Sequence, residues 1–332
     1  MRLAQRFSLL FLASAFSLPL VACGGGGDDG GDDDTGPPEG DHHQFVVSAL
    51  ELPTKTGDGD RLGVDLNDDG VVDNALGGIL TGLASQAPGL NLQASLDKEV
   101  QVGNVILLAD VQATDLTAAA RVGLTVHVGK DPNPAACTDP NDEATCGKHL
   151  QGGASFSLAD EGTPGTLSGK IIGGDYTGGP GRLSLALALE GAIIKLNLVG
   201  AHAELTGVTA DGFTGKVAGA ITKGEIDSQV IPAIYQTVTT VVARDCPNPE
   251  AADCGCVDGG SGGAVLMIFD KDPSTGPGDP VGNCVISEEE VRNSQILTQL
   301  LDPDVDMEEP LDGTPDSLSV GVGVTTVKAT WQ

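Results

Sequence analysis

Apolar and polar residues alternate through most of the stretch from Gln101 to Thr222, and this period of two constrains the fold more than any other feature of the chain. The clearest run is residues 183–189, where leucine alternates with serine or alanine. Such a period puts every second side chain on one face of a β-strand. Clusters rich in Gly and Pro, among them Thr177–Gly181, interrupt the alternation at intervals of about eight to twelve residues. This spacing favours antiparallel strands in a sandwich or a strongly curved sheet.

The expected strands lie at residues 101–113, 122–128, 150–158, 166–172, 183–189, 192–199, 201–209, 212–222 and 317–331. Helical periods predict helices at 74–86 and 226–243, the second with Pro232 in its first turns, where proline is tolerated. Because the last strand alternates again, we expect it to rejoin the sheet, so that residues 45–332 form a single domain. The predicted fold class is mainly β (α+β): an antiparallel curved sheet or sandwich with flanking helices.

The first residues are typical of an export signal. Two arginines precede an apolar run over residues 7–20, which is too short for a comfortable membrane-spanning helix. The run ends in Leu-Val-Ala-Cys at residues 20–23, which resembles the bacterial lipobox. The resemblance implies that residues 1–22 are a signal peptide and that Cys23 carries a lipid, which would anchor the exported protein in the cell envelope. Gly24 after the cysteine leaves outer-membrane sorting open, and the outer membrane is the destination we expect.

An acidic, glycine-rich segment follows the expected lipidation site. It holds seven acids and no base between Gly24 and Asp41. A self-repelling segment without apolar residues cannot offset the entropy of ordering. We therefore expect residues 23–44 to be a flexible tether.

Six cysteines remain beyond Cys23, an even number that predicts three disulfides in an oxidising compartment: Cys137, Cys146, Cys246, Cys254, Cys256 and Cys284. The first two bracket a loop rich in Pro, Asn and Asp, and we expect them to pair. Cys254 and Cys256 are too close to bridge each other without strain. We therefore favour Cys246–Cys254 with Cys256–Cys284, the rival being Cys246–Cys256 with Cys254–Cys284. A zinc site is a weaker use of the same cluster in an exported, acidic protein.

Three acidic loops carry the only site chemistry that the sequence indicates. In the first, near residues 65–76, oxygen-bearing side chains stand at positions one, three, five and nine, with glycine at six and a carbonyl available at seven: Asp65, Asn67, Asp69, Asp73, Gly70 and Val71. This layout resembles the Ca²⁺ loop of the dockerin and EF-hand families. Leu76 replaces the acid expected at position twelve. The alternative is an acidic turn in which Asp73 or Asn74 caps the next helix.

The second loop, near 270–290, resembles an EF-hand with apolar helical patterns on both sides, which predicts a C-terminal EF-hand-like helix-loop-helix. Its candidate ligands are Asp270, Asp272, Asn283 and Glu290. It departs from the pattern by an insertion between positions three and five, and by Cys284 where glycine is expected. The alternative is that Ser287 and Glu290 form a capping box that begins a helix without any metal.

The third loop, near 306–319, repeats the first with two extra residues and with Pro315 inside it. Its candidate ligands are Asp306, Glu308, Asp312 and Asp316. A plain turn rich in Pro and Asp is the alternative. Calcium is the expected cofactor, and its role is to stabilise the fold; whether the second and third loops also bind it is left open.

Composition excludes some functions. A net charge of −30 leaves no basic surface for nucleic acid, so we expect no nucleic-acid partner. The sequence shows no nucleophile elbow, zinc helix, phosphate loop or dinucleotide glycine pattern, so we expect no enzyme activity. Aromatic residues make up only 3% of the chain, which argues against a platform that stacks on sugar rings.

Two functions remain. The first is a lipid-anchored, calcium-binding structural or adhesive surface module, whose protein partner is unknown. The second is an envelope carrier that holds an apolar ligand in its curved sheet. The whole chain resembles Gly/Asp-rich lipoproteins of Gram-negative bacteria, and this resemblance implies an envelope location but no activity.

Overall fold

A computed structural model describes residues 36–86, 91–139, 141–159, 165–189, 192–251, 254–270 and 283–332, which lie in one compact unit. The expected signal peptide and Cys23, and the expected tether up to residue 35, lie outside the described residues. The first strand, β1, runs Asp41–Glu51. The last four residues of the expected tether, 41–44, therefore belong to the sheet.

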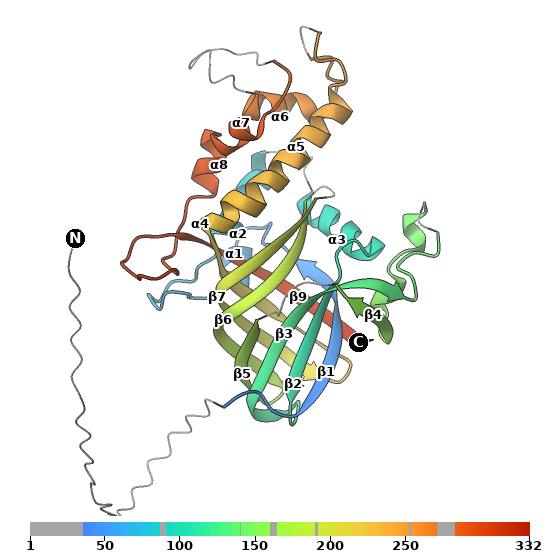
Figure 1. Cartoon of the computed structure of the whole chain (residues 1–332), viewed down its shortest axis with the longest axis vertical. Coiled ribbons are helices and arrows are strands. Elements are labelled where there is room, and N and C mark those ends of the chain that lie inside the picture. Colours follow the sequence, from blue (N-terminus) through green and yellow to red (C-terminus); the bar gives the residue numbers. More distant parts are fainter. Residues whose placement is uncertain are drawn as a thin grey trace, which may run out of the picture. The chain divides into compact units, whose positions relative to one another are not determined.

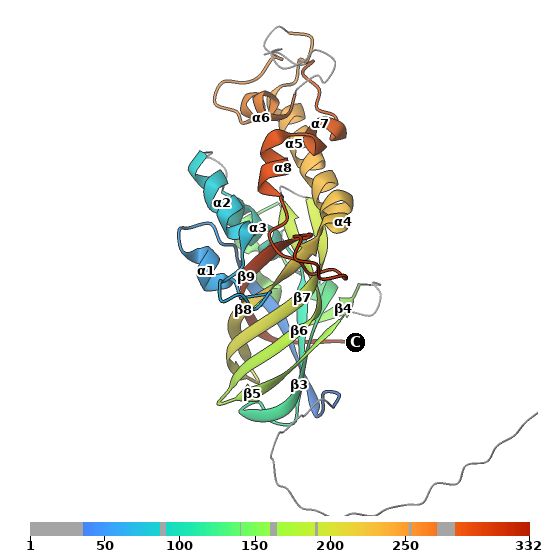
Figure 2. The ribbon, with the colours of Figure 1, turned by 90° about the vertical axis from the view of Figure 1, so that its left-hand side faces the viewer.

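In chain order the strands are β1, β2 Leu107–Ala113, β3 Ala118–Asn133, β4 Ala154–Leu158, β5 Thr166–Ile172, β6 Asp175–Leu189, β7 Ala192–Thr209, β8 Gly212–Thr222 and β9 Ser317–Trp331. The α-helices are α1 Asp58–Leu62, α2 Ala75–Gln86, α3 Leu92–Val102, α4 Lys223–Glu225, α5 Ile231–Asp245, α6 Gly262–Phe269, α7 Glu288–Arg292 and α8 Gln295–Leu300. Short 3₁₀ turns span Glu143–Thr145 and Lys148–Leu150, and a π-helical turn, Ile226–Val230, leads into α5. Helices α2, α3 and α5 gather at one end of the strands (Figures 1 and 2).

Eight of the strands close into an antiparallel β-barrel. Around the ring the order is β1-β2-β3-β5-β6-β7-β8-β9, and β9 pairs with β1 to close it. Strand β4 lies outside the ring, where it pairs with β3 and, in parallel, with β9. A mainly β fold with flanking helices is thus confirmed. The expectation of a curved sheet or sandwich is wrong, because the C-terminal strand pairs with the first strand and leaves the ring no free edge.

The inside of the barrel is filled by apolar side chains. Phe45 and Phe213 meet edge to face with ring centroids 5.2 Å apart, and Leu124 and Leu183 are each only 1% exposed. The hydroxyl of buried Tyr176 donates to the carbonyl of Leu167 at 2.8 Å. An eight-stranded barrel is just wide enough for side chains to fill. The interior cavity measures about 20 Å³, room for about one water molecule.

Two predicted interruptions of the sheet are bulges inside long strands. Residues 192–199 and 201–209, expected as two strands, form the single strand β7, and Gly200 between them has a φ of 56°. The pairing with β8 shifts register at this point. Likewise, the expected turn at 177–181 lies within β6, where the pairing with β7 shifts register twice. Glycine accepts the backbone conformation of a bulge, so these clusters bend a strand rather than end it.

Both predicted helices are confirmed, with Pro232 in the first turn of α5. The strand expected at 101–113 is only partly correct, because α3 extends to Val102 and β2 begins at Leu107. Helix α3 is capped by Asn91, whose side chain accepts from the N–H of Ala94 at 3.0 Å. Within the described ranges, no helix is both long and apolar enough to cross a membrane.

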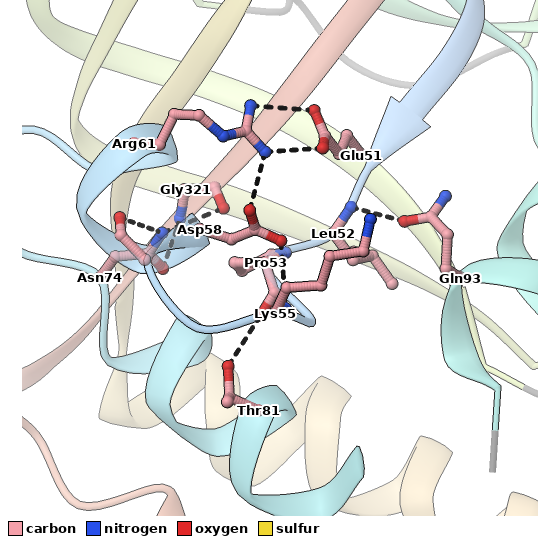
Figure 3. A network of polar contacts seen from close by, with 11 residues as sticks. Glu51, Leu52, Pro53, Lys55, Asp58, Arg61, Asn74, Thr81, Gln93 and Gly321 are labelled. Atoms are coloured by element: carbon pink, nitrogen blue, oxygen red, sulfur yellow. Dashed lines mark hydrogen bonds and ion pairs between the residues drawn. The ribbon is translucent and has the colours of Figure 1, made fainter. Parts of the chain in front are cut away.

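Helix α1 docks on the outer wall of the barrel through glycines of β9. A Cβ at Gly321 would overlap the carbonyl oxygen of Leu62, so only glycine allows this approach. Asn74 fixes the contact, since its side chain accepts from the N–H of Gly321 at 3.1 Å and donates to the carbonyl of Gly59 at 3.2 Å. Figure 3 shows Asn74 between α1 and Gly321. Small residues on the outer face of the sheet thus bring α1 and the first acidic loop against β9.

We predict that Gly321→Ala lowers the free energy of unfolding by about 1–3 kcal/mol, the usual cost of overpacking, because α1 must move away from β9. Gly78→Ala is the matched control. Gly78 lies in α2 with open space around it, so alanine should raise stability by about 0.5–1 kcal/mol. Urea unfolding of both variants measures the difference. If Gly321→Ala were as stable as Gly78→Ala, the contact between α1 and β9 would not be close.

Candidate metal centre

The three acidic loops lie between regular elements. Loop 1 (residues 65–76) links α1 to α2, loop 2 (270–290) links α6 to α7, and loop 3 (306–319) leads from α8 into β9. Isolated bridges close the base of loops 1 and 3, pairing Val64 with Asp73 and Val305 with Ser317. The ends of these two loops are therefore fixed by backbone hydrogen bonds.

All three loops share a first hydrogen bond. The carboxylate at position one accepts from the backbone N–H of the residue at position six. The pairs are Asp65 with Gly70 at 2.8 Å, Asp270 with Cys284 at 2.7 Å and Asp306 with Gly313 at 2.5 Å. The position-six residues have φ values of 86°, 62° and 81°. Cys284 thus adopts the left-handed conformation that glycine adopts in the other two loops.

A second hydrogen bond is also common to the loops. The side chain at position five accepts from the N–H two residues later. The pairs are Asp69 with Val71 at 2.8 Å, Asn283 with Val285 at 2.8 Å and Asp312 with Thr314 at 2.9 Å. The insertions in loops 2 and 3 therefore leave positions five to seven in the same arrangement as in loop 1.

Loops 1 and 3 share a third bond, from the N–H at position two to the acid at position nine. Leu66 donates to Asp73 at 2.8 Å, and Met307 donates to Asp316 at 3.0 Å. The sequence repeat between these loops is therefore a structural repeat. In loop 1, Asn67 joins the set, because its side-chain oxygen and Oδ1 of Asp65 each accept from the N–H of Asp69 at 3.1 Å.

Loops 1 and 3 lie against each other. Leu66 of loop 1 is buried with Val305 and Ala220, and Met307 packs on the same small cluster. Ser319 joins the two segments, since its hydroxyl accepts from the N–H of Ala75 at 2.8 Å and donates to the carboxylate of Asp304. Sequence reasoning missed Asp304 and Ser319. The serine lies in β9 and carries no motif.

The acids at this contact repel one another. Burial raises the pKa of Asp73, the nearby charges of Asp304, Asp69 and Asp65 raise it further, and the hydrogen bond from Leu66 only partly opposes them. The charged form of Asp73 is therefore disfavoured in the fold. For Asp316 burial acts in the same direction, but hydrogen bonds from Met307, Ser317 and Glu308 outweigh it and lower the pKa.

One carboxylate oxygen of loop 3 has no hydrogen-bond partner among the described residues. Oδ1 of Asp306 is buried and makes no hydrogen bond within the described part of the chain. An unsatisfied buried oxygen of this kind calls for a donor or a cation. Across the described ranges, however, no three His, Cys, Asp or Glu side chains converge as a metal cluster.

Loop 2 brings only part of its predicted ligand set together. Asp270 is buried and accepts from the N–H of Asn283 at 3.0 Å, whereas Asp272 lies outside the described residues. Glu290 forms the alternative, a capping box, accepting from the N–H of Ser287 at 2.7 Å and beginning α7. Helices α6 and α7 flank the loop as expected, and its EF-hand character stays a prediction.

The disulfides confirm one predicted pair and correct the other two. Cys137 bonds Cys146 as expected. The favoured pairing of the other four cysteines is wrong, because Cys246 bonds Cys256 and Cys254 bonds Cys284. The cause is local: the N–H of Val257 donates to the carbonyl of Asp245 at 2.8 Å, which brings residue 256 back to the end of α5. Cys254 is then free of Cys246 and bonds Cys284 in loop 2.

Asp245 holds this turn together. Its carboxylate accepts from Nε of Arg244 at 2.7 Å and from the N–H groups of Ser261 and Gly262 at 2.8 and 3.1 Å. The hydrogen bond from Arg244 lowers the pKa of Asp245 to about 2, the two backbone bonds adding to it against the effect of burial. The carboxylate of Asp245, next to Cys246 in the sequence, therefore joins the end of α5 to the start of α6.

Comparison of the chain with protein-family models, with curated proteins and with solved structures finds no match. The geometry of the loops and of the barrel is therefore the basis for the function argued below.

We predict that acid loosens the junction of α5 and α6. Since the folded-state pKa of Asp245 is about 2, below the ordinary 3.8, its stabilising effect is present above pH 4 and is lost as the pH falls through 2. Asp245→Asn should lower stability at pH 6 and weaken its dependence on pH between 4 and 2. Denaturant unfolding across this range tests it, and identical pH profiles for the two proteins would contradict it.

Proposed function

We propose that the protein is a non-enzymatic module of the cell envelope, lipid-anchored at Cys23 and stabilised by calcium bound in its acidic loops. The observation that carries the proposal is the repeated hydrogen-bond pattern of the loops, together with the close packing of loops 1 and 3. Side chains at positions one, three, five and nine around a left-handed position six are the layout that Ca²⁺ loops use.

Two sets of oxygen atoms would hold the ions. In loop 1 they come from Asp65, Asn67, Asp69, Asp73 and the carbonyl of Val71. In loop 3 they come from Asp306, Glu308, Asp312 and Asp316. Calcium takes six to eight oxygen ligands, including amide and carbonyl oxygens. A count of carboxylates alone therefore underestimates the number of ligands in these loops.

Electrostatics supports a cation at this place. The neighbours that raise the pKa of Asp73 are all acids, and Oδ1 of Asp306 lacks a donor among the described residues. A divalent ion in each of the two loops would offset this repulsion in a chain whose net charge is −30. The residues present therefore fit calcium.

The expected effect on stability is moderate. Extracellular sites bind calcium with a Kd of about 0.1–1 mM. At about 1 mM calcium and a Kd of about 0.1 mM, each site adds about 1.4 kcal/mol to the free energy of unfolding. Because loop 1 follows β1 and loop 3 precedes β9, that energy would stabilise the pairing that closes the barrel.

Loop 2 is proposed as a third site with a reduced ligand set. Asp270 and Asn283 lie together, and Asp272 would complete positions one, three and five. Glu290 would have to leave the capping box of α7 in order to bind. We therefore expect loop 2 to bind calcium more weakly than loops 1 and 3.

We predict that calcium raises the thermal midpoint of the wild-type protein by about 5 °C relative to a chelator. For the variant Asp73→Asn, whether it is more or less stable than the wild type should depend on calcium. Without calcium the variant should be as stable as the wild type or more so, because the amide removes a charge that the fold disfavours. With calcium it should lose most of the gain.

Asp211→Asn is the matched control for this experiment. Asp211 is an exposed acid in the turn between β7 and β8, away from the loops, so its variant should keep the full calcium shift. Calorimetric scans of the three proteins, each with calcium and with chelator, give the comparison. A wild-type midpoint that calcium does not move would contradict the proposal.

Anchoring at Cys23 is supported by the lipobox-like sequence and by the disulfides, which are typical of exported proteins. We predict that the wild-type protein sediments with membranes and that Cys23→Ser releases it into the soluble exported fraction. Cys137→Ser is the matched control, because it removes a cysteine without touching the anchor. Equal membrane association of the wild type and Cys23→Ser would contradict lipid anchoring.

The alternative is an envelope carrier for an apolar ligand, and an antiparallel barrel is compatible with it. Its interior cavity of about 20 Å³ is too small for such a ligand unless side chains move. Saturable uptake of a fluorescent fatty acid by the full chain would favour the carrier over the module.

A further inference from the structure

An open groove of about 360 Å³ lies on the outer wall of the barrel, lined by residues of α1, β1, β9, β8 and β7. Its volume is within the range of small-molecule sites. None of the candidate calcium ligands lines it. The groove is therefore distinct from the proposed calcium sites, and its chemistry points to a different ligand.

Two rows of side chains, each crossing four strands, form the floor of the groove. Cross-strand pairing aligns the first row as Glu51, Gly323, Lys216 and Glu204. It aligns the second as Ala49, Thr325, Thr214 and Thr206. Neighbouring strands lie about 4.8 Å apart, so the threonine row extends for about 10 Å.

The charges of the groove are already paired. Arg61 donates to both oxygens of Glu51, at 3.1 and 2.6 Å, and to Asp58 at 3.0 Å. Figure 3 shows this guanidinium between the two carboxylates. On the opposite side, Lys216 donates to the carbonyl of Gly63 at 2.7 Å and pairs with Glu204 at 3.3 Å. Among the described residues both cations of the groove are thus paired with carboxylates, three carboxylates to two cations, so no positive charge is free to attract an anion.

The threonine row, in contrast, has hydrogen-bonding capacity to spare. Thr206, Thr214 and Thr325 are exposed. Their hydroxyls make no hydrogen bond to any described residue. Each hydroxyl can donate one hydrogen bond and accept two. The carboxylates of Glu51 and Glu204, held by their cations, can accept further bonds at either end of the row.

We propose that this groove binds a neutral, hydroxyl-rich ligand, a saccharide, whose hydroxyls bond the threonine row and the paired carboxylates beside it. An apolar ligand would leave these polar groups unsatisfied. An anionic one would meet the field of a chain with a net charge of −30. None of the described residues that line the groove is aromatic, so recognition rests on hydrogen bonds.

Titration of the full chain with two neutral trisaccharides, maltotriose and chitotriose, tests the proposal by saturation-transfer NMR. At least one should bind, with a Kd on the order of 1 mM. Thr214→Val keeps the shape of the central floor residue and removes its hydroxyl, so it should weaken binding about fivefold. Thr330→Val is the matched control, an exposed threonine of β9 outside the groove, and it should leave the Kd unchanged.

The charged trisaccharide trigalacturonate completes the experiment and should not bind. Three results would overturn the proposal: no binding of either neutral sugar at about ten times the expected Kd, equal affinities for the wild type and Thr214→Val, or binding of trigalacturonate alone. None of these results depends on whether the acidic loops bind calcium.

Discussion

The antiparallel pairing of β1 with β9 is the constraint on which the rest of the structure depends. It places Glu51 opposite Gly323 and Leu50 opposite Val324, and so joins segments from opposite ends of the domain. Because the strands run in opposite directions, the chain that leaves β1 and the chain that enters β9 meet at the same end of the barrel. Loops 1 and 3 are neighbours for this reason, and the groove beside α1 crosses the same seam. Closure also leaves the eight-stranded ring without the free edges that invite aggregation.

The acidic residues of loops 1 and 3, next to the β1–β9 pairing, repel one another. The hydrogen bonds of the fold offset this repulsion only in part. Backbone N–H groups satisfy most of the carboxylate oxygens in the loops, which is why the pKa of Asp316 falls. Asp73 receives one such bond, and burial among other acids still raises its pKa. A small barrel end that carries this much like charge is stabilised most directly by a cation. We propose that the loops receive this cation, whereas the groove beside them takes an uncharged ligand.

The sequence predicted the mainly β class of the fold and the return of the last strand to the sheet, but it did not predict the closed barrel. Strands 166–172 and 212–222 were predicted to the residue, because alternation and turn residues are local signals. Gly200 and the cluster at 177–181 were misread, because the same glycine that ends a strand also forms a bulge. Helix α3 was not predicted, and its last two residues were assigned to the strand expected at 101–113. Three features join segments that are far apart in the sequence: the pairing of β1 with β9, the disulfide partners, and the contact of Asp304 with Ser319. No local pattern encodes them.

Sequence reasoning found the three loops because their spacing is written in consecutive residues. It could not show that loops 1 and 3 touch, or that they share three hydrogen bonds at equivalent positions. A calorimetric titration of the metal-free protein with Ca²⁺ is the most direct test of the central claim. The account predicts at least two ions per chain, with a Kd of about 0.1–1 mM for the paired loops. A titration with no heat of binding, and no calcium retained in equilibrium dialysis at about 1 mM, would contradict it.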